Sequence, residues 1–548
     1  MTRIGDANDK ATSIQSLENA FKAKSLVAVI AGDGHPLYPI EAPHPYAILD
    51  FFHITYIWKE KQIPKGGSQD AGEVSVWRVR FEKANLNKPS WWKPGYIPNP
   101  AAVKTREQTC MKCNKSSKEI FTVGWFCLKN FCDDYFIFPG QQKVDVKGLE
   151  YSSEFLQERT PFTEPIPSLT PQMPDGKELH GTEMASRRGF VCPLCGSCNR
   201  RIHWNFLVCE NKKCTFVRQA PMKAYPKDAL RSENEDCIKK CHARRLRHRP
   251  NHLHATILNS NHLRNSEVLS LGGFTVSMFY LPDKSGKIIG GFALLASTPG
   301  INSRPGGPDE LFRELEAQDI GLRRNPAAVA GHKLEGLTRH FQQNFGARYK
   351  FGVAVQSKGF DEAPATILCA LYRLIWAKQA VTSAARRYIG ALNQDAFDGD
   401  LKKITESKNF NELLALGYME NDSINYHDDG ESELGPVVAA LSLGSPSLMR
   451  FRPKRKSEFV LPTQGLKHKP VYKDVLEVPM MHGDMMVMFG TQVQRLYEHA
   501  VEPLGKRRFA LTARYIDPAK MVVKADKKDA DIKGAIPERA RQFEYDGF

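Results

Sequence analysis

Repeated cysteine spacing constrains the fold of this chain more than any other feature of its sequence. Four cysteines with the spacing C-x2-C-x13-C-x4-C occur twice, as Cys110, Cys113, Cys127 and Cys132 and again as Cys192, Cys195, Cys209 and Cys214. A tetrahedral zinc ion takes four thiolate or imidazole ligands, and a short C-x2-C turn presents two sulfurs from one knuckle. Because chance pairing would not repeat the same spacers, we predict two small modules stabilised by structural zinc. Trp125 and Trp204, close to the third cysteine of each set, are the expected apolar caps.

The remaining cysteines bear on the compartment and on a third metal site. Eleven of the twelve cysteines lie between Cys110 and Cys241, and their close pairing favours metal binding in a reducing compartment over disulfides. Five residues near the second module are left over and could bind a further metal: Cys198, His203, Cys237, Cys241 and His242. Free thiols beside a basic loop explain them equally well, so both interpretations stay open.

The charge balance indicates a class of partner. Lys and Arg outnumber Asp and Glu by 16 in 548 residues, which favours nucleic acid or an acidic protein surface. The basic run Lys239–Arg249 suits phosphate contact or nuclear import, with a solvated surface as an equal alternative. The N-terminus is polar, and the apolar stretch Ile288–Ala296 is too short to span a membrane. We therefore expect a protein without a membrane span that is nuclear, with the cytoplasm as the alternative.

Composition changes along the chain suggest where its domains divide. The length predicts two to four domains, and a stretch rich in Pro, Glu, Ser and Thr over 149–188 is typical of an extended linker. A hairpin is expected over Phe274–Ala296, and helices over Asp309–Ala317 and Ala363–Ala380. The expected divisions are an N-terminal region with the first cysteine module (1–148), the linker (149–188), the second module with its basic run (189–250), an intermediate α+β region packed on the next domain (251–339), a C-terminal domain (340–520) and a charged tail (521–548).

Short apolar segments broken by Gly and Pro dominate the chain after Asn411. The expected strands are Val437–Leu443, Ser447–Phe451, Val475–Pro479, Met485–Phe489 and Phe509–Ile516. Short antiparallel strands of this kind suit a double-stranded β-helix, the jelly roll. The segment Arg452–Lys473 is a basic insertion within it. The predicted fold class is α+β, with a jelly roll at the C-terminus preceded by the small zinc-stabilised modules.

Three side chains of this region have the character of an iron site. His427 and Asp429 form an H-x-D pair, and His499 follows later in the chain. Two imidazoles and one carboxylate on one face of an iron(II) ion leave three positions open for a cosubstrate and oxygen. Arg508 and Arg514 come soon after, and a guanidinium fork can bind a planar carboxylate through two parallel hydrogen bonds.

Several motifs occur in one order between about Phe341 and Asp517. They are Tyr418, His427-x-Asp429-x-Glu431, VVAALSLG ending at Gly444, His482-Gly-Asp484, RLYEH ending at His499, and the run from Arg508 to Arg514. In this order the region resembles the AlkB family of iron(II)- and 2-oxoglutarate-dependent dioxygenases, which oxidatively remove alkyl groups from DNA or RNA bases. The resemblance implies that His427, Asp429 and His499 bind the iron. His482 is set aside because it matches the family's turn into a strand.

The same resemblance implies roles in binding the cosubstrate and the substrate. Arg508 would pair with the distal carboxylate of 2-oxoglutarate, Arg514 would lie near its oxalyl end, and Tyr418 matches the cosubstrate tyrosine. Glu431 aligns with the acidic position that meets the target base in relatives.

Three positions depart from the family's pattern. Ala510 stands where an asparagine is usual, and Leu416, two residues before the tyrosine, removes a second polar contact to the cosubstrate. Gly430 replaces an acid beside the metal aspartate. These changes affect the cosubstrate and base contacts more than the iron ligands.

The function implied by the resemblance is oxidative demethylation of bases in DNA or RNA, which consumes oxygen and releases formaldehyde and succinate. Two alternatives remain open on the same sequence. One is an oxygenase that hydroxylates or demethylates a protein side chain, and the other is an inactive, zinc-dependent nucleic-acid-binding protein. The sequence does not decide between DNA and RNA, the modified base, single and double strands, the role of 251–339, or the oligomeric state.

Overall fold

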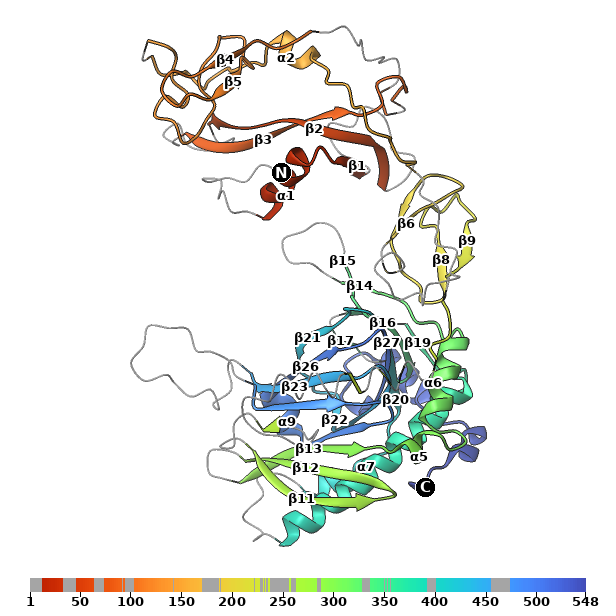
Figure 1. Ribbon diagram of the computed structural model, residues 1–548. Coiled ribbons are helices and arrows are strands. Elements are labelled where there is room, and N and C mark those ends of the chain that lie inside the picture. Colours follow the sequence, from red (N-terminus) through yellow and green to blue (C-terminus); the bar gives the residue numbers. More distant parts are fainter. Residues whose placement is uncertain are drawn as a thin grey trace. The chain divides into compact units, whose positions relative to one another are not determined.

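In the computed structural model, the chain folds into two compact units (Figure 1). The first comprises Met1–Met173, Phe190–Asn199 and Cys209–Phe216, and the second comprises Pro174–Gly189, Arg200–Val208 and Val217–Phe548. The described residues are 12–32, 46–63, 73–90, 92–93, 103–140, 142–169, 187, 189–220, 222–226, 230, 232, 235–236, 256–257, 263–282, 287–327, 336–348, 350–351, 353–354, 356–391, 401–454 and 474–548. The predicted second module, 189–250, is therefore not one domain, because its residues are shared between the two units.

A three-stranded antiparallel sheet is the largest element of the first unit. Its order is β1-β2-β3, and its long central strand is rich in aromatic and β-branched residues, which favour strands. The sheet elements and the helix before them are α1 (Thr12–Lys22), β1 (Leu26–Gly32), β2 (Tyr46–Gln62) and β3 (Val74–Lys83). Two short hairpins of this unit flank cysteines, and their strands are β4 (Glu107–Thr109), β5 (Ser116–Lys118), β6 (Phe190–Val191) and β7 (Cys198–Asn199).

The segment after residue 149 packs into the first unit. Helix α2 (Ser153–Gln157) begins at Ser152, whose hydroxyl accepts a hydrogen bond from the Phe155 N–H. Phe155 is buried, and its ring centroid lies 4.4 Å from the guanidinium carbon of Arg80. The prediction that the linker begins at residue 149 is therefore wrong. Although its composition is typical of a linker, the segment is held in the first unit by the buried side chain of Phe155. Most of the predicted linker beyond residue 169 lies outside the described residues.

Two sheets form the frame of the second unit. The larger has the order β11-β12-β13-β25-β22-β27-β20-β16-β19, and the smaller has the order β10-β24-β23-β26-β21. The strands of the larger sheet are β11 (Arg264–Leu271), β12 (Phe274–Pro282), β13 (Ile288–Ala296), β16 (Phe341–Gly346), β19 (Ser357–Lys358), β20 (Glu412–Met419), β22 (Leu434–Gly444), β25 (Met485–Phe489) and β27 (Arg507–Ile516). Those of the smaller are β10 (Thr256–Ile257), β21 (Ile424–His427), β23 (Ser447–Pro453), β24 (Leu476–Met480) and β26 (Tyr497–Pro503). All five strands predicted after Asn411 are present.

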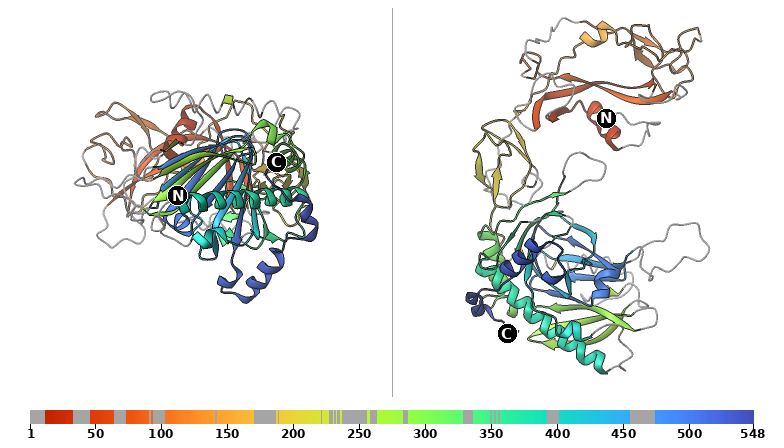
Figure 2. Two further views of the ribbon diagram at one scale, coloured as in Figure 1. Left: turned by 90° about the horizontal axis from the view of Figure 1, so that it is seen from below. Right: turned by 180° about the vertical axis from the view of Figure 1, so that it is seen from behind.

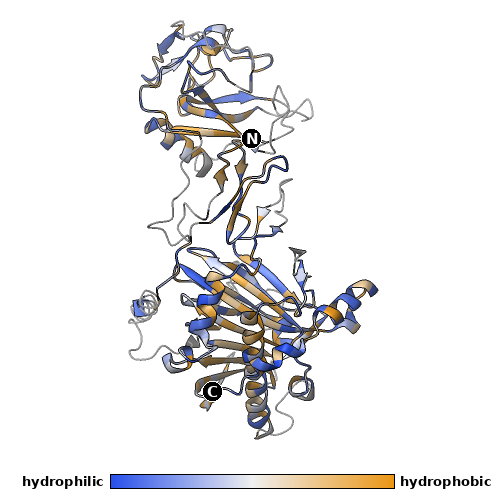
Figure 3. Ribbon diagram, turned by 90° about the vertical axis from the view of Figure 1, so that its right-hand side faces the viewer, coloured by the Kyte–Doolittle hydropathy of each residue, from blue (hydrophilic) through white to orange (hydrophobic). Residues whose placement is uncertain are grey.

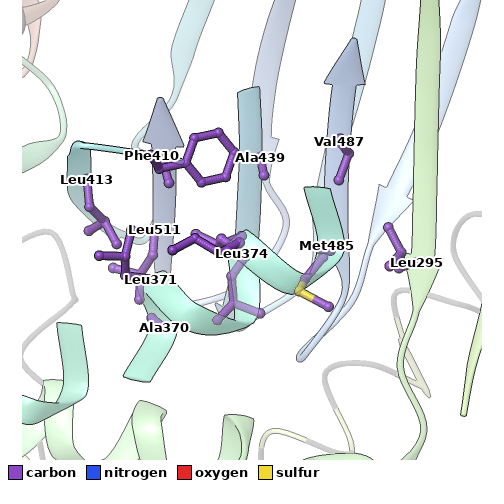
Figure 4. Close-up of a cluster of buried hydrophobic side chains, with 14 of the residues drawn as sticks. Leu295, Ala370, Leu371, Leu374, Phe410, Leu413, Ala439, Met485, Val487 and Leu511 are labelled. Atoms are coloured by element: carbon purple, nitrogen blue, oxygen red, sulfur yellow. The ribbon is translucent and has the colours of Figure 1, made fainter. Parts of the chain in front are cut away.

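Buried side chains from both sheets meet in one core. The ring centroids of Phe292 in β13 and Phe451 in β23 are 4.0 Å apart, and Met486 of β25 belongs to the same cluster. Because side chains alternate along a strand, Met485 lies on the opposite face of β25, where helix α7 (Ala365–Ala391) packs (Figures 2 and 4). Two facing sheets with a helix on the outer face of the larger one match the expected α+β jelly roll.

Many residues of the largest buried cluster in the second unit lie in helix α7 and in the strands of the larger sheet. Hydrophobic residues, drawn in orange, recur along these strands (Figure 3). The helix continues to Ala391, beyond its predicted end at Ala380. In the described part of the chain, no helix has both the length and the apolar character that crossing a membrane requires. The shorter helices of this unit are α5 (Pro299–Asn302), α6 (Pro308–Ala317), α8 (Leu401–Thr405), α9 (Thr491–Leu496) and the 3-10 helix η3 (Pro518–Lys520). Its small two-stranded ladders are β8 (Phe206–Val208) with β9 (Val217–Gln219), β14 (Pro326–Ala327) with β15 (Gly336–Leu337), and β17 (Lys350–Phe351) with β18 (Val353–Ala354).

The predicted intermediate region shares the large sheet instead of merely packing on it. Strand β13 pairs with β25, with Ala293 opposite Val487, and β12 and β11 extend the sheet beyond it. Strand β13 is buried along almost its whole length, as expected for a strand covered on both faces. The predicted boundary between 339 and 340 is therefore wrong, because backbone hydrogen bonds join the two sides into one sheet.

The last residues of the chain are packed as well. They form α10 (Lys524–Lys533) and the 3-10 helix η4 (Glu538–Phe543), in which Ala530 and Ala540 are fully buried. Arg539 donates hydrogen bonds to the carbonyl oxygens of Asp361 and Ala363, just before α7. The expectation of a charged tail over 521–548 is therefore wrong, because two small apolar side chains and one arginine fix it to the second unit.

Candidate active site

Strand pairing brings the two candidate histidine ligands together. His427 ends β21 and lies opposite His499 of β26 in the small sheet, with ring centroids 4.2 Å apart. Asp429 lies two residues beyond the end of β21 and is 2% exposed. Its Oδ2 lies 4.0 Å from His499 Nε2. All three side chains line one pocket between the two sheets.

The donor set suits iron(II), although its atoms are spaced more widely than in a closed metal site. Ligands about 2.1 Å from a metal and at right angles to each other lie about 3 Å apart. Among the described residues, the groups whose ligand atoms all lie within 4.8 Å of one another are two sets of cysteines. His427 Nδ1 lies 2.9 Å from the Asn425 carbonyl oxygen, which leaves Nε2 as the metal-facing nitrogen. Binding an ion would therefore require these ligand atoms to move closer together.

Local electrostatics give the candidate ligands the protonation states that a metal needs. Burial lowers the pKa of His499 to about 3, and the charges of His427 and Arg514 act in the same direction. Burial would raise the pKa of Asp429, but Arg514 and the two imidazoles outweigh it and hold that pKa well below its usual range. At neutral pH the site therefore offers a neutral buried imidazole and a carboxylate, as metal binding requires.

Alternation along β27 builds the other wall of the pocket. Arg508, Ala510, Thr512 and Arg514 line the pocket, whereas Phe509, Leu511 and Ala513 pack toward α7. Tyr418 of β20 lies opposite Arg508, and Leu416 lies opposite Ala510. Ala510 and Leu416, the two apolar residues that depart from the family's pattern, are therefore neighbours and form one apolar patch of the pocket wall.

Arg508 has the surroundings expected of a carboxylate anchor. Its side chain is 5% exposed, and its guanidinium carbon lies 5.2 Å from the ring centroid of Tyr418. Burial lowers the pKa of Arg508, an effect that the nearby Tyr418 partly offsets, and burial raises the pKa of Tyr418 to about 12. The buried Nε and Nη1 of Arg508 have no hydrogen-bond partner. Since a buried cation with unmet donors is costly, the residues present fit an anionic ligand such as 2-oxoglutarate.

Arg514 holds the candidate metal carboxylate. Its Nη2 donates to Asp429 Oδ1 over 3.0 Å, and its Nη1 lies 3.5 Å from Glu412 Oε2. Glu412 is fully buried, and burial raises its pKa to about 8 against the opposing charge of Arg514. Sequence reasoning missed Glu412, whose only signal is an acid in the otherwise apolar strand β20, directly opposite Arg514.

Glu431, the candidate substrate contact, and His482, which the sequence analysis set aside, are not among the residues that line the histidine pocket. Glu431 lines a neighbouring pocket with Arg348 and Val523. His482 accepts a hydrogen bond from the Gly444 N–H on Nδ1, at 2.9 Å, and its Nε2 lies 3.1 Å from Asp309 Oδ1. Both ring nitrogens of His482 therefore have partners in the turn before β25, and His482 does not line the histidine pocket.

The first cysteine set has the dimensions of a zinc site. The Sγ atoms of Cys110 and Cys132 are 3.8 Å apart, as are those of Cys113 and Cys127. A tetrahedral ion with zinc–sulfur bonds of about 2.3 Å places its ligands about 3.8 Å apart. Trp125 packs against this cluster, as predicted. The four sulfurs therefore fit zinc and are too far apart for disulfides.

The second set repeats this arrangement. The Sγ distances are 3.7 Å between Cys192 and Cys214 and 3.6 Å between Cys195 and Cys209. Both knuckles turn at a residue with positive φ just after the second cysteine, Asn114 in one and Gly196 in the other, which lets the chain reverse around the metal. Trp204, the expected apolar cap of this set, does not cap it. Its ring is buried in the second unit, where it packs against the rings of Phe341 and Phe509.

A third metal site finds no support in the described residues. Cys198 and His203 belong to neither ligand set whose atoms lie within 4.8 Å of one another. Cys237, Cys241 and His242, like the basic run Lys239–Arg249, lie outside the described residues.

Comparison with known proteins finds a match in the C-terminal region of the chain. Residues 309–516 match the family model of the 2OG-Fe(II) oxygenase superfamily. The match includes α6, whose Asp309 contacts His482, so the domain begins before the predicted boundary at 340.

The curated proteins to which this chain is similar are named alpha-ketoglutarate-dependent dioxygenase alkB homolog 3. The Rattus norvegicus protein is 32% identical over 115 residues, which are 20% of this chain and 36% of the relative. The Mus musculus protein is 33% identical over 98 residues (17% and 32%), and the Homo sapiens protein is 32% identical over 95 residues (17% and 30%). The chain thus spans about a third of the length of the curated relatives that it matches. The C-terminal region of this chain, residues 309–516, is therefore similar to the 2OG-Fe(II) oxygenase superfamily and AlkB-like in sequence.

Proposed function

We propose that this protein is an iron(II)- and 2-oxoglutarate-dependent dioxygenase that removes alkyl groups from bases in DNA or RNA. The observation that carries the proposal is one pocket that combines His427, Asp429 and His499 with the unmet donors of Arg508. Nuclear repair of alkylated DNA is the setting that we propose, in line with the positive charge of the chain.

The residues of the pocket have different proposed roles in binding and positioning. His427, Asp429 and His499 would hold the iron, and Arg508 with Tyr418 would bind the distal carboxylate of the cosubstrate. When bound, iron with 2-oxoglutarate and oxygen supplies the oxidation of a substrate C–H bond. Arg514 keeps Asp429 ionised and oriented, since their hydrogen bond disfavours protonation of that carboxylate.

Nucleic acid is the proposed substrate because of the AlkB-like sequence and the excess of basic residues. A base in a duplex must leave the stack to reach a pocket between two sheets, at a cost of roughly a few kcal/mol. Glu431 is the proposed contact to the target base. Its place in a neighbouring pocket means that the base would extend from the histidines toward Arg348.

Each cysteine set is proposed to bind one structural zinc ion. Four thiolates at tetrahedral spacing leave no open position for a reaction, so these sites stabilise the first unit and take no part in the chemistry. Their proposed use is to keep that unit folded for binding the polymer.

A product assay tests the function. The full chain with iron(II) and 2-oxoglutarate is incubated separately with N-methylated single-stranded oligonucleotides and with methylated histone peptides, and formaldehyde and succinate are measured. We expect both products from the oligonucleotides, and none in His427→Ala. Turnover on peptides alone would mean a protein oxygenase, and no turnover on either would favour the inactive binding protein that Ala510 and Leu416 suggest.

A further inference from the structure

Ser442 is a buried hydroxyl that the proposed roles leave unused. It lies in β22, is 1% exposed, and lines the pocket that contains the histidines and Arg508. Its backbone is fixed on both sides, since its N–H donates to Asp484 O and its carbonyl accepts from Gly483 N. Its Oγ has no hydrogen-bond partner. A buried hydroxyl without a partner costs stability, so its place in the pocket calls for a ligand.

Strand register places this hydroxyl next to the proposed anchor. Ser442 lies directly opposite Ala510 on β27, and Gly444 lies opposite Arg508. Residues directly opposite in an antiparallel pair have Cβ atoms about 5 Å apart, and diagonal neighbours about 7–8 Å apart lie within reach of long side chains. Ser442 is thus the diagonal neighbour of Arg508, on the same face of the sheet.

The chemistry of the pocket indicates what Ser442 binds. The patch opposite it is apolar, because Ala510 lies opposite Leu416 and neither side chain can donate a hydrogen bond to a carboxylate oxygen. A planar carboxylate has more acceptor sites than one guanidinium fork fills. A serine hydroxyl at the diagonal position can donate to an oxygen that Arg508 leaves free.

We propose that Ser442 Oγ donates a hydrogen bond to the distal carboxylate of 2-oxoglutarate beside Arg508, and so supplies the polar contact that Ala510 lacks. This inference rests on the proposed function, in that 2-oxoglutarate is the cosubstrate of this pocket. Ser442 is a binding residue that sets the affinity and chain-length preference for the cosubstrate.

Ligand titration of the full chain loaded with Mn(II) tests the proposal without turnover. 2-Oxoglutarate and oxalate are titrated by calorimetry into wild type and Ser442→Ala; oxalate binds the metal but has no distal carboxylate. We expect Ser442→Ala to raise the Kd for 2-oxoglutarate about tenfold, because a hydrogen bond to a charged group is lost. The Kd values for oxalate and for Mn(II) should stay unchanged.

Ser447→Ala is the matched control. Ser447 is also fully buried with an unpartnered Oγ, but it lies on β23 and does not line this pocket. We expect the control to bind both ligands as wild type does. Wild-type affinity for 2-oxoglutarate in Ser442→Ala, or an equal loss for both ligands, would overturn this inference alone. A wild type that binds oxalate but not 2-oxoglutarate would overturn the proposed function together with this inference.

Discussion

Single residues of the pocket carry charges that the fold alone does not stabilise. The Arg508 guanidinium is buried beside Leu416 and Ala510, and two of its donor nitrogens have no partner. Such a residue lowers stability until an anion binds. A conflict between stability and binding is therefore expected at this position.

Replacing Arg508 should separate the two effects. In Arg508→Met the apolar side chain fills a similar space without a buried charge, so we expect a free energy of unfolding about 1–4 kcal/mol higher. Loss of a charged, bidentate contact should weaken 2-oxoglutarate binding by about a hundredfold. Chemical unfolding without ligands and a 2-oxoglutarate titration measure the two changes. A variant that is less stable yet binds as tightly as wild type would contradict this assignment of Arg508.

Glu412 gives the second prediction at this scale. Burial raises its pKa to about 8 in the folded protein, whereas a glutamate in an unfolded chain titrates near about 4.3. The folded state binds the proton more tightly, so this group reduces stability progressively as the pH rises from about 4.3 to about 8. We expect Glu412→Gln to match wild type near pH 4.5 and to be roughly 4 kcal/mol more stable at pH 8. Urea unfolding over this pH range is the measurement, and a pH-independent difference would refute the buried, proton-binding role.

Among the elements, the apolar strands are those that the sequence predicts best. Strand β25 (Met485–Phe489) has the predicted bounds, because a short run of large apolar residues between glycines has few alternatives. The pattern does not predict β26, since Glu498 and Glu502 interrupt it. These acids pair across to Arg452 and Arg450 of β23, at 2.6 and 2.7 Å, and such partners become visible only once the register is known.

Helix α10 provides a test of the packed C-terminus. Ala530 is fully buried, so Ala530→Asp would place an unpaired charge in an apolar site, and we expect a loss of several kcal/mol in the free energy of unfolding. The control Asp529→Ala removes an exposed pair with Lys533 and should change stability by less than about 1 kcal/mol. Thermal and urea unfolding of both variants measure the difference. Equal free energies of unfolding for the two variants would instead support the original expectation that residues 521–548 form a charged tail.

The cysteine modules predict a metal content. We expect about two zinc ions per chain, one for each closed set of four thiolates. Cys110→Ser and Cys192→Ser should each lose one ion, whereas Cys369→Ser, outside both sets, should keep two. Elemental analysis of freshly purified protein decides this. If elemental analysis finds no zinc in the purified protein, the prediction that the two cysteine sets bind zinc is wrong.

At the scale of the whole molecule, the sequence predicts the family resemblance of the C-terminal region better than the divisions of the chain. Ordered motifs single out His427, Asp429 and His499 as candidate ligands because ligand chemistry restricts the residue types, and the structure places all three in one pocket. The sequence does not single out Glu412 or Ser442, because the residues opposite them, Arg514 and Ala510, become known only with the strand register. Domain boundaries fail for a similar reason, since the pairing of β13 with β25 joins segments far apart in the chain.

The central claim is that two histidines and an aspartate from β21 and β26 bind iron beside an arginine that holds 2-oxoglutarate. Anaerobic addition of iron(II) and 2-oxoglutarate to the full chain, followed by visible absorption, tests it most directly. We predict a weak charge-transfer band in wild type that is absent in His427→Ala. No band in the wild-type protein would contradict the account.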